Sequence, residues 1–548
     1  MSFFSQTVRS KPSWWEKIHN HDIVAKWREE MVEHDRETVE ALWGGERHAD
    51  PRGMVKMWPR DPLTDAQLKY IFEELEYEAS QLDPTTGSFA TSIRGVYESR
   101  SLINSDLKAQ LVRASSIFEN VPDEDKDWHP YTDNQVLDLV HPSLYHIRIG
   151  CTLVRQLDAK TKEYVLTTLD KDAYRLLRPD LNLLKFNDCA ISDVYQWLPT
   201  DFAVSSDGQV SPLGYINNVH PSRHRALYPA VSSIVARFVP LWERVLSDVL
   251  SPAPPQAIDI NAEWYEGPAK DWDGPNSDDD DETNDKHWVE WDRTTRWPTI
   301  PEPAPFAPPP TAGRVEFPLR GRTLQVIVKL ASIHLTPEKP VYPGGSWHVE
   351  GMANERVVAT GLYYYAMENV AESRLAFRQR VGDGDFGTKL PYENGDYKGP
   401  TVVYGLRNDD ALSQALGHLV AEEYKCVAFP NVYQHFVEAF KLEDETRPGH
   451  RKILALFLVD PNVRILSTTD VPPQQQEWAV AVAEAEALGG VRKLPQELLD
   501  MIFGFTEPAL MSRKQAEEHR EKLMEERSAF VEYHNEQTFE MHFAMCEH

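Results

Sequence analysis

The part of the chain that decides the fold begins with GRTLQVIVKLASIHLTP at residues 321–337 and ends with HRKILALFLVD at residues 450–460. Both segments are rich in Val, Ile and Leu, which is typical of long buried strands. Shorter β-prone segments lie between them: GGSWHVEG (344–351), RVVATGLYYYAMENV (356–370) and KCVAFPNVYQHFVEAF (425–440). The turns between them contain Gly and Pro, and strands and helices do not alternate regularly. This pattern predicts a barrel or jelly roll.

Helical patterns flank this β region, so we expect an α+β fold. Residues 1–130 repeat apolar positions at three- and four-residue intervals, as amphipathic helices do. Residues 131–265 are mixed and end in a helix whose apolar stripe predicts core packing. Residues 313–470 form the predicted β core. Residues 471–548 are helical again, with a charged amphipathic helix at 511–537 expected to pack on the core or to mediate a dimer contact.

Residues 266–312 read as an insertion between these parts. DWDGPNSDDDDETNDK (271–286) is an acidic run that cannot bury itself, and it lacks the ligand order of an EF-hand calcium loop. WPTIPEPAPFAPPP (297–310) contains seven prolines and predicts an extended tether.

The bulk composition limits the classes of function. The chain has 548 residues, 41% hydrophobic content and a formal charge of −29. It is long enough for a large core, and its acidity argues against nucleic acid and anionic membranes as partners. The four cysteines are scattered without zinc-site spacing, and no apolar run reaches the length of a membrane span. We expect a soluble monomer or homodimer in the cytoplasm, with the nucleus as an alternative.

Three residues have the pattern of a metal site. In a strand, positions i and i+2 share a face, so His348 and Glu350 can bind one metal together. His435 follows 87 positions later (435 − 348) on another β-prone segment. Two imidazoles and one carboxylate on one face of Fe(II) leave three positions open for oxygen and a co-substrate. Zinc accepts the same ligands, so these residues alone do not fix the metal.

Arg451 is the candidate for holding an anion near that metal. It lies 16 positions after His435 (451 − 435) and precedes a strongly apolar strand, where an unpaired guanidinium is costly. A guanidinium grips a carboxylate through two parallel hydrogen bonds. His450 and Lys452 are the alternatives for this role.

Three more residues are tentative substrate-binding candidates. Tyr215 and Asn217 lie in YINNVHP (215–221), which is otherwise a turn with one Asn in the left-handed conformation. Lys329 interrupts an apolar strand and needs a carboxylate partner if it faces inward. The Gly- and Asp-rich loop at 381–400 is the type of segment that closes over a site.

Several of these blocks together resemble known proteins. VHPSLY, YQWLPTDF, YINNVHP, GGSWHVEGMANERVVATGLYYY, FPNVYQH and RPGHRKILALFLVDPNVRILST are similar to a large family of uncharacterised fungal proteins. The last three are also similar, in order and spacing, to the Fe(II)/2-oxoglutarate dioxygenase superfamily, in which H-x-D/E, a distal His and a following Arg or Lys line a double-stranded β-helix. The resemblance implies metal ligation by His348, Glu350 and His435, and 2-oxoglutarate binding by Arg451.

The resulting hypothesis is a non-haem iron oxygenase that uses 2-oxoglutarate as co-substrate. Its primary substrate is expected to be a small metabolite or an amino-acid-like molecule, with a protein side chain as the alternative. A zinc hydrolase with the same ligands and a noncatalytic interaction protein on a jelly-roll fold are the two rival classes.

Overall fold

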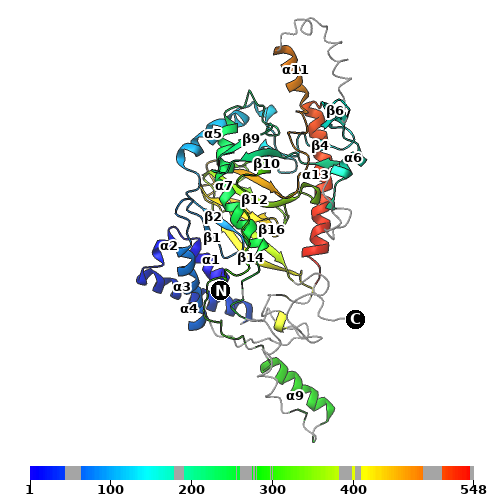
Figure 1. Ribbon diagram of the computed structural model, residues 1–548. Helices are drawn as coiled ribbons and strands as arrows, with labels where there is room; N and C mark the ends of the chain where they lie inside the picture. Colours follow the sequence, from blue (N-terminus) through cyan, green and yellow to red (C-terminus); the bar gives the residue numbers. More distant parts are fainter. Residues whose placement is uncertain are drawn as a thin grey trace.

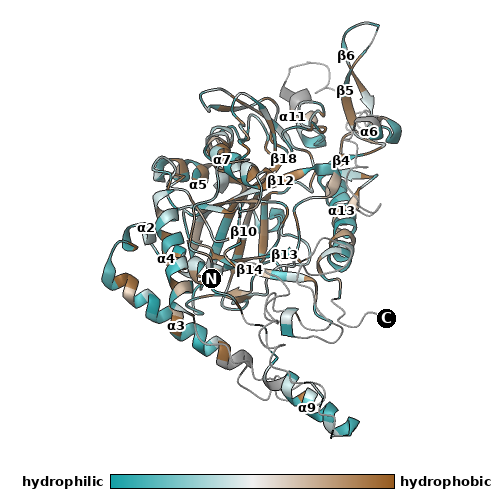
Figure 2. Cartoon of the chain, turned by 60° about the horizontal axis from the view of Figure 1, so that its bottom comes forward, coloured by the Kyte–Doolittle hydropathy of each residue, from teal (hydrophilic) through white to brown (hydrophobic). Residues whose placement is uncertain are grey.

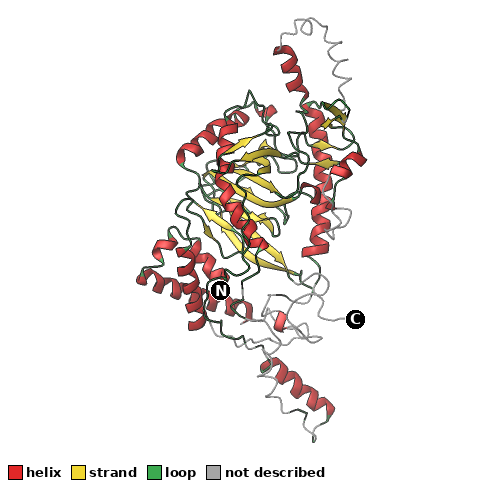
Figure 3. Ribbon diagram, viewed as in Figure 1, coloured by secondary structure: helices red, strands yellow, loops and turns green. Residues whose placement is uncertain are grey.

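A computed structural model gives the protein a mixed fold of helices and antiparallel sheets, with strands gathered at the centre and helices around them (Figure 3). It describes residues 1–43, 63–158, 160–177, 190–254, 256–258, 274, 275, 278, 280–296, 298, 300–381, 398–400, 406, 409–485 and 509–542. The predicted α+β combination is confirmed at this level.

The largest sheet is antiparallel and has the order β1–β2–β15–β12–β18–β10–β8–β9, with β3 also paired to β10. Its strands are β1 (Phe89–Ala90), β2 (Tyr97–Ser99), β3 (Val136–Val140), β8 (Thr200–Val204), β9 (Val210–Pro212), β10 (Thr323–Leu335), β12 (Val357–Glu368), β15 (Cys426–Pro430) and β18 (Gly449–Val459). Strands from the first 265 residues therefore extend the sheet that the β-rich region builds.

A second sheet has the order β14–β13–β16, from Ser413–Val420, Arg374–Arg380 and Gln434–Val437. Two short strands from the same part of the chain, β11 (Val341–Tyr342) and β17 (Phe440–Lys441), pair with each other. Two further two-stranded sheets join β4 (Ile147–Arg148) to β7 (Tyr195–Gln196) and β5 (Leu153–Leu157) to β6 (Tyr164–Thr168).

Strand β18 shows how the two faces of the large sheet differ. One set of alternate residues packs in the cluster that contains α7: Leu454, Leu456 and Leu458. The other set packs with strands β13 and β14 of the second sheet: Ile453, Ala455, Phe457 and Val459. Since alternate side chains of a strand point to opposite faces, the odd-numbered residues of β18 face the space between the two sheets. We call this space the inter-sheet core.

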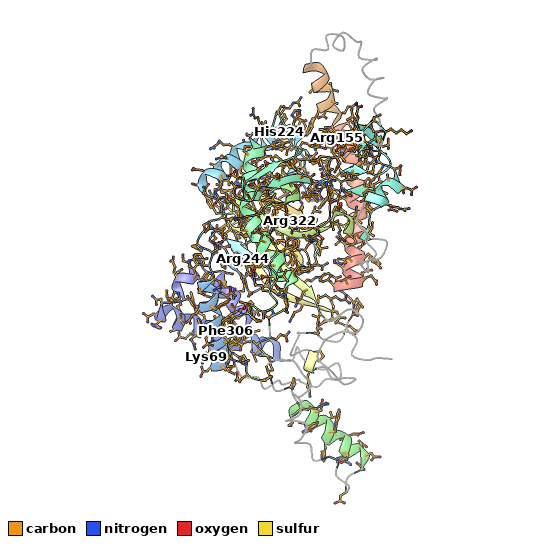
Figure 4. The ribbon with its side chains drawn as sticks, in the orientation of Figure 1. Lys69, Arg155, His224, Arg244, Phe306 and Arg322 are labelled. Carbon is orange, nitrogen blue, oxygen red and sulfur yellow. The ribbon has the colours of Figure 1, made fainter. Side chains whose placement is uncertain are left out.

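Helix α7 (Leu227–Leu250) lies across the outer face of the large sheet (Figure 1). The close approach depends on Gly361 of β12, where an added Cβ would come within 2.7 Å of the Phe238 ring. Arg244, labelled in Figure 4, lies 4.2 Å from the Tyr97 ring of β2. The periodic apolar stripe thus correctly predicted a buried helix.

The other helices surround this core. The N-terminal helices share one apolar cluster with β1, and α5 packs against α7. Their bounds are α1 (Ser2–Arg9), α2 (Trp14–Lys17), α3 (His21–Trp43), α4 (Asp65–Ser80), α5 (Ser105–Glu119), α6 (Lys171–Leu177), α9 (Asp281–Thr294), α11 (Gln476–Ala485) and α13 (Arg513–His534), with single turns η2 (Asp123–Asp125), η5 (Ala353–Glu355) and the π-helical η7 (Asn535–Phe539). Among the described helices, none is long and apolar enough to cross a membrane.

The acidic insertion differs from the expected irregular segment. Its C-terminal part enters α9, and the Asp280 side chain caps the helix by accepting from the Thr283 backbone N–H at 2.8 Å. Asp281 and Glu282 occupy the first turn, where a negative charge is favourable for the helix dipole. The helix is hydrophilic and projects from the body of the protein (Figure 2). The predicted closing loop at 381–400 lies almost wholly outside the described residues.

Candidate metal centre

His348, Glu350 and His435 come together at the edge of the second sheet. His435 belongs to β16, and it forms an isolated antiparallel bridge with His348, in which each backbone N–H donates to the other's carbonyl at 3.2 and 3.0 Å. Glu350 follows in a bend rather than in the expected strand. One potential ligand atom from each of the three residues lies within 4.8 Å of the other two.

The three side chains have the spacing and protonation that a metal needs. Glu350 Oε1 lies 3.3 Å from His435 Nε2 and 3.8 Å from His348 Nε2. Bonds of about 2.0–2.2 Å to one metal place neighbouring ligand atoms roughly 3 Å apart, so only small movements are required. His348 Nδ1 donates to the Ser346 carbonyl at 2.7 Å, which leaves the lone pair of a neutral ring on Nε2. The donor set therefore fits a divalent ion.

The carboxylate dominates the electrostatics of this group. Burial alone would raise the pKa of Glu350, but the neighbouring imidazoles of His348 and His435 outweigh burial and hold the pKa below its usual range. Burial and the charge of His348 lower the pKa of His435. For His348, the negative charge of the neighbouring Glu350 carboxylate outweighs burial and raises the pKa. An ionised carboxylate beside two imidazoles is suited to a cation.

Aromatic residues enclose the distal imidazole. The ring centroids of Phe429 and Phe377 lie 4.9 and 6.3 Å from that of His435. Both phenylalanines belong to the inter-sheet core. His435 is therefore buried, whereas the His348 side chain is 35% exposed and forms the more open side of the group.

Asn431 fixes the backbone on either side of Glu350. Its Oδ1 accepts from the Glu350 N–H at 2.8 Å, and its Nδ2 donates to the carbonyls of Glu350 and Val357 at 2.9 and 3.0 Å. No sequence motif indicated a role for Asn431. Its position in FPNVYQH, four residues before His435, is the only local signal for it.

Asn431→Ala is expected to weaken Mn(II) binding about 10- to 100-fold, because residues that orient a metal ligand have effects of this size. Titration of free Mn(II) by electron paramagnetic resonance measures the change. Asn369→Ala is the matched control, since Asn369 also bridges a turn, through Asp444 N–H at 2.8 Å and the Arg447 carbonyl at 2.7 Å. Unchanged affinity in the first variant, or an equal loss in the control, would contradict this role.

Arg451 projects into the inter-sheet core without an acidic partner. It is 2% exposed, and its Nη1 donates to Ser373 Oγ at 2.6 Å. The rings of Phe440 and Tyr364 lie 5.0 and 5.6 Å from the guanidinium carbon. Within the described residues, no carboxylate lies within 4.0 Å of it, and its Nε has no hydrogen-bond partner. Burial lowers the pKa of Arg451, opposed by Tyr364 and Tyr342.

The two alternatives to Arg451 lie on the other face of β18. Lys452 pairs with Glu119 of α5 at 2.6 Å, and His450 lies opposite His334 of β10. The alternation of the strand therefore directs only Arg451 into the space that His435 also borders.

Of the tentative substrate residues, Lys329 alone faces the inter-sheet core. It lies in β10 opposite Ala455, a member of that core. Tyr215 instead packs with Trp478 and belongs to a separate apolar cluster. Asn217 Nδ2 donates to the carbonyl of Leu144 at 3.1 Å. A substrate role for Tyr215 and Asn217 stays a prediction without support from their surroundings.

The turn that contains Asn217 has a structural explanation. Asn218 has a φ of +67°, the left-handed conformation, and its Nδ2 donates to the carbonyls of His141 and Leu144 at 2.8 and 3.0 Å. Both asparagines thus fasten this turn to the segment after β3.

A second group of potential metal ligands was not foreseen. His129, Asp138 and His141 offer atoms that lie within 4.8 Å of one another. The sequence signal was the VHPSLY block directly after a strand, to which no chemistry had been assigned.

A cavity of about 570 Å³ borders Glu350 but is not lined by His348 or His435. It lies between the segment around Glu350 and the C-terminal helix, and Phe530, His534 and Phe539 supply its other wall.

Comparisons with known proteins add a family and a few distant structures. The model of a family described as "Protein of unknown function (DUF4246)" matches residues 65–482, more than half of the chain, and the model of its N-terminal domain matches residues 1–30. No curated protein matches.

Three solved structures illustrate the distance to characterised proteins. The Fe(II)/(alpha)ketoglutarate-dependent dioxygenase TqaL is 12% identical, with 67% of this chain and 95% of that chain covered and a TM-score of 0.24. IDO from Bacillus thuringiensis is 9% identical, with 66% of this chain and 89% of that chain covered and a TM-score of 0.20. Oxalate decarboxylase from Bacillus subtilis is 11% identical, with 40% of this chain and 51% of that chain covered and a TM-score of 0.13. TM-scores of this size do not establish a common fold.

Proposed function

The chain belongs to the family described as protein of unknown function DUF4246, and we propose that it is a non-haem iron oxygenase that uses 2-oxoglutarate as co-substrate. The observation that carries this proposal is the buried guanidinium of Arg451, which has no acidic partner among the described residues and faces the same inter-sheet core as the His348–Glu350–His435 group. A metal triad alone suits many reactions, but the combination suits a ligand that chelates metal at one end and presents a carboxylate at the other.

The strand order supports a double-stranded β-helix as the scaffold. If the strands from β10 to β18 are numbered in chain order, with the His348 bridge segment counted with β11 and the short β17 counted with β16, the large sheet contains the first, third, sixth and eighth. The second sheet contains the fourth, fifth and seventh, and the His348 bridge adds the second to it. This alternation between two facing sheets is the winding expected of such a fold. It brings metal ligands on the second and seventh strands close together.

Burial makes Arg451 a strong anion site. An ionised guanidinium in an apolar interior carries a desolvation penalty of several kcal/mol unless a counter-charge is present. Ser373 Oγ accepts a hydrogen bond from Nη1. The remaining N–H groups of the guanidinium suit the distal carboxylate of 2-oxoglutarate, to which they can donate two parallel hydrogen bonds. The rings of Phe440 and Tyr364 flank the guanidinium and exclude water from the pair.

The chain's contribution to the reaction is orientation and exclusion of water. His348 and His435 present imidazole nitrogens, Glu350 presents a carboxylate, and Asn431 holds the Glu350 backbone in place. Phe429 and Phe377 shield the side of His435 that faces the core. When bound, ferrous iron and 2-oxoglutarate together supply the oxygen activation, with succinate and carbon dioxide as co-products.

Oxygen consumption matched by succinate formation is the expected activity of the Fe(II)-loaded protein. Both should require 2-oxoglutarate and should be lost when Zn(II) replaces Fe(II). An oxygen electrode and succinate quantification by mass spectrometry measure the two in one reaction. Hydrolytic activity with Zn(II) and no 2-oxoglutarate dependence would contradict the proposal and favour a hydrolase.

A further inference from the structure

The second group, His129, Asp138 and His141, faces the same interior as the metal triad. Asp138 of β3 lies opposite Ala331 of β10. Lys329 precedes Ala331 by two positions, so Asp138 and Lys329 point to the same side of the large sheet. This is the side of the inter-sheet core.

Lys329 of β10 is a cation on the same face of the large sheet as Asp138. Within the described part of the chain it makes no hydrogen bond or ion pair, although it is half-buried. Its charge opposes the rise in the pKa of His348 in the triad, and it also acts on Asp138 and His141. An ammonium in this position is available to an anionic group that lies next to the metal site.

The hydrogen bonding of His141 is wrong for a metal ligand. Its Nδ1 accepts from the Ser143 backbone N–H at 3.2 Å, so a neutral ring carries its proton on Nε2. Burial keeps the pKa of His141 well below its usual range. The ring therefore presents an N–H donor, in contrast to His348, whose Nδ1 is the donor and whose Nε2 is free to bind metal. The nearby cations Lys329 and Arg520 also disfavour a second metal ion.

Asp138 supplies the complementary acceptor. Its Oδ2 accepts from His129 Nδ1 at 2.7 Å and lies 3.9 Å from Arg520 Nη1. Among the described residues, its Oδ1 has no hydrogen-bond partner, although the residue is only 4% exposed. A buried carboxylate oxygen without a donor is costly, so this atom suits an N–H group of a ligand.

We propose that Lys329, His141 and Asp138 bind the head group of a free amino acid, which is the primary substrate. The ammonium of Lys329 and the Nε2–H of His141 hold its carboxylate, and Asp138 Oδ1 accepts from its protonated amine. Its identification as a substrate rests on the proposed oxygenase function, whereas the binding site itself does not. A simple carboxylate leaves Asp138 unpaired, and a simple amine leaves Lys329 unpaired.

The test is a thermal-shift and calorimetric screen of the standard L-amino acids against the Mn(II)- and 2-oxoglutarate-loaded full chain without oxygen. We expect at least one amino acid to bind. Lys329→Met and Asp138→Asn should each weaken that binding about 10- to 100-fold, because each removes a charged hydrogen-bond partner. Mn(II) affinity should stay unchanged.

Matched analogues separate recognition from a structural role. The parent protein should bind the amino acid and its deaminated carboxylic acid with different affinities, and so should Lys329→Met. In Asp138→Asn, this difference between the two ligands should largely disappear. Lys452→Met is the control, because Lys452 lies on a neighbouring strand but faces the opposite side and pairs with Glu119. Since Lys329 has no partner among the described residues, Lys329→Met should not lower the melting temperature of the ligand-free protein.

Three outcomes would overturn the proposal: no amino acid binds to a chain that binds Mn(II) and 2-oxoglutarate; affinity is unchanged in both variants; or a second equivalent of metal binds and is lost in His141→Ala. Amino-acid binding to a chain that binds neither Mn(II) nor 2-oxoglutarate would support this site while removing the oxygenase function. The two proposals can therefore fail separately.

Discussion

Replacing His348 or His435 with alanine is expected to abolish stoichiometric binding of Mn(II) or Fe(II), a loss of at least about 100-fold, since removing a ligand exceeds the effect of removing a residue that orients one. His348→Ala is the cleaner variant, because its side chain is 35% exposed and contributes little to packing. His435 is buried against Phe429, so its replacement also costs some stability. Metal analysis after gel filtration, with circular dichroism to monitor folding, measures both effects.

His334→Ala is the control for the triad. His334 is a partly buried imidazole on β10 that lies opposite His450, outside the triad. It should bind metal like the parent. If His348→Ala and His435→Ala also bind metal like the parent, the assignment of the triad is wrong.

Arg451→Ala is expected to leave metal affinity nearly unchanged and to weaken 2-oxoglutarate binding by roughly 30-fold to several thousand-fold. Loss of one partner of a desolvated charge pair typically costs about 2–5 kcal/mol. Arg451→Lys should recover only part of the affinity, because an ammonium cannot form the planar, two-bond contact. Calorimetry with the Mn(II)-loaded protein measures these affinities.

The state of the Arg451→Ala protein distinguishes a ligand-binding arginine from a structural one. Arg451 has no acidic partner among the described residues, so removing it leaves no buried carboxylate unpaired. The variant should fold, as should Lys452→Ala, which should bind 2-oxoglutarate normally. Unfolding of Arg451→Ala, or unchanged 2-oxoglutarate affinity, would contradict the assignment.

The sequence predicted those features that local pattern determines. The apolar composition of β10 and β18 and the helical periodicity of α7 were sufficient to identify these elements. The triad residues could be selected because strand alternation and the resemblance agreed. The expected strand around His348 and Glu350 proved to be a single bridge and a bend.

Features that depend on distant pairing could not be predicted. Asp138 reaches the interior only because β3 pairs with β10, almost 200 residues later, with a bulge after Leu330 that sets its register. Asn431 acts through backbone groups, which leave no residue-type pattern. Tyr215 and Asn217 were selected by residue type, but the turn they occupy directs them to another cluster.

Calorimetric titration of 2-oxoglutarate into the full chain in the absence of oxygen, with and without Mn(II), tests the central claim most directly. The geometry of the triad and Arg451 predicts one equivalent of 2-oxoglutarate bound with Mn(II) and far weaker binding without it, since the metal and the guanidinium hold opposite ends of the ligand. No binding with Mn(II) present, or equal affinity with and without the metal, would contradict it.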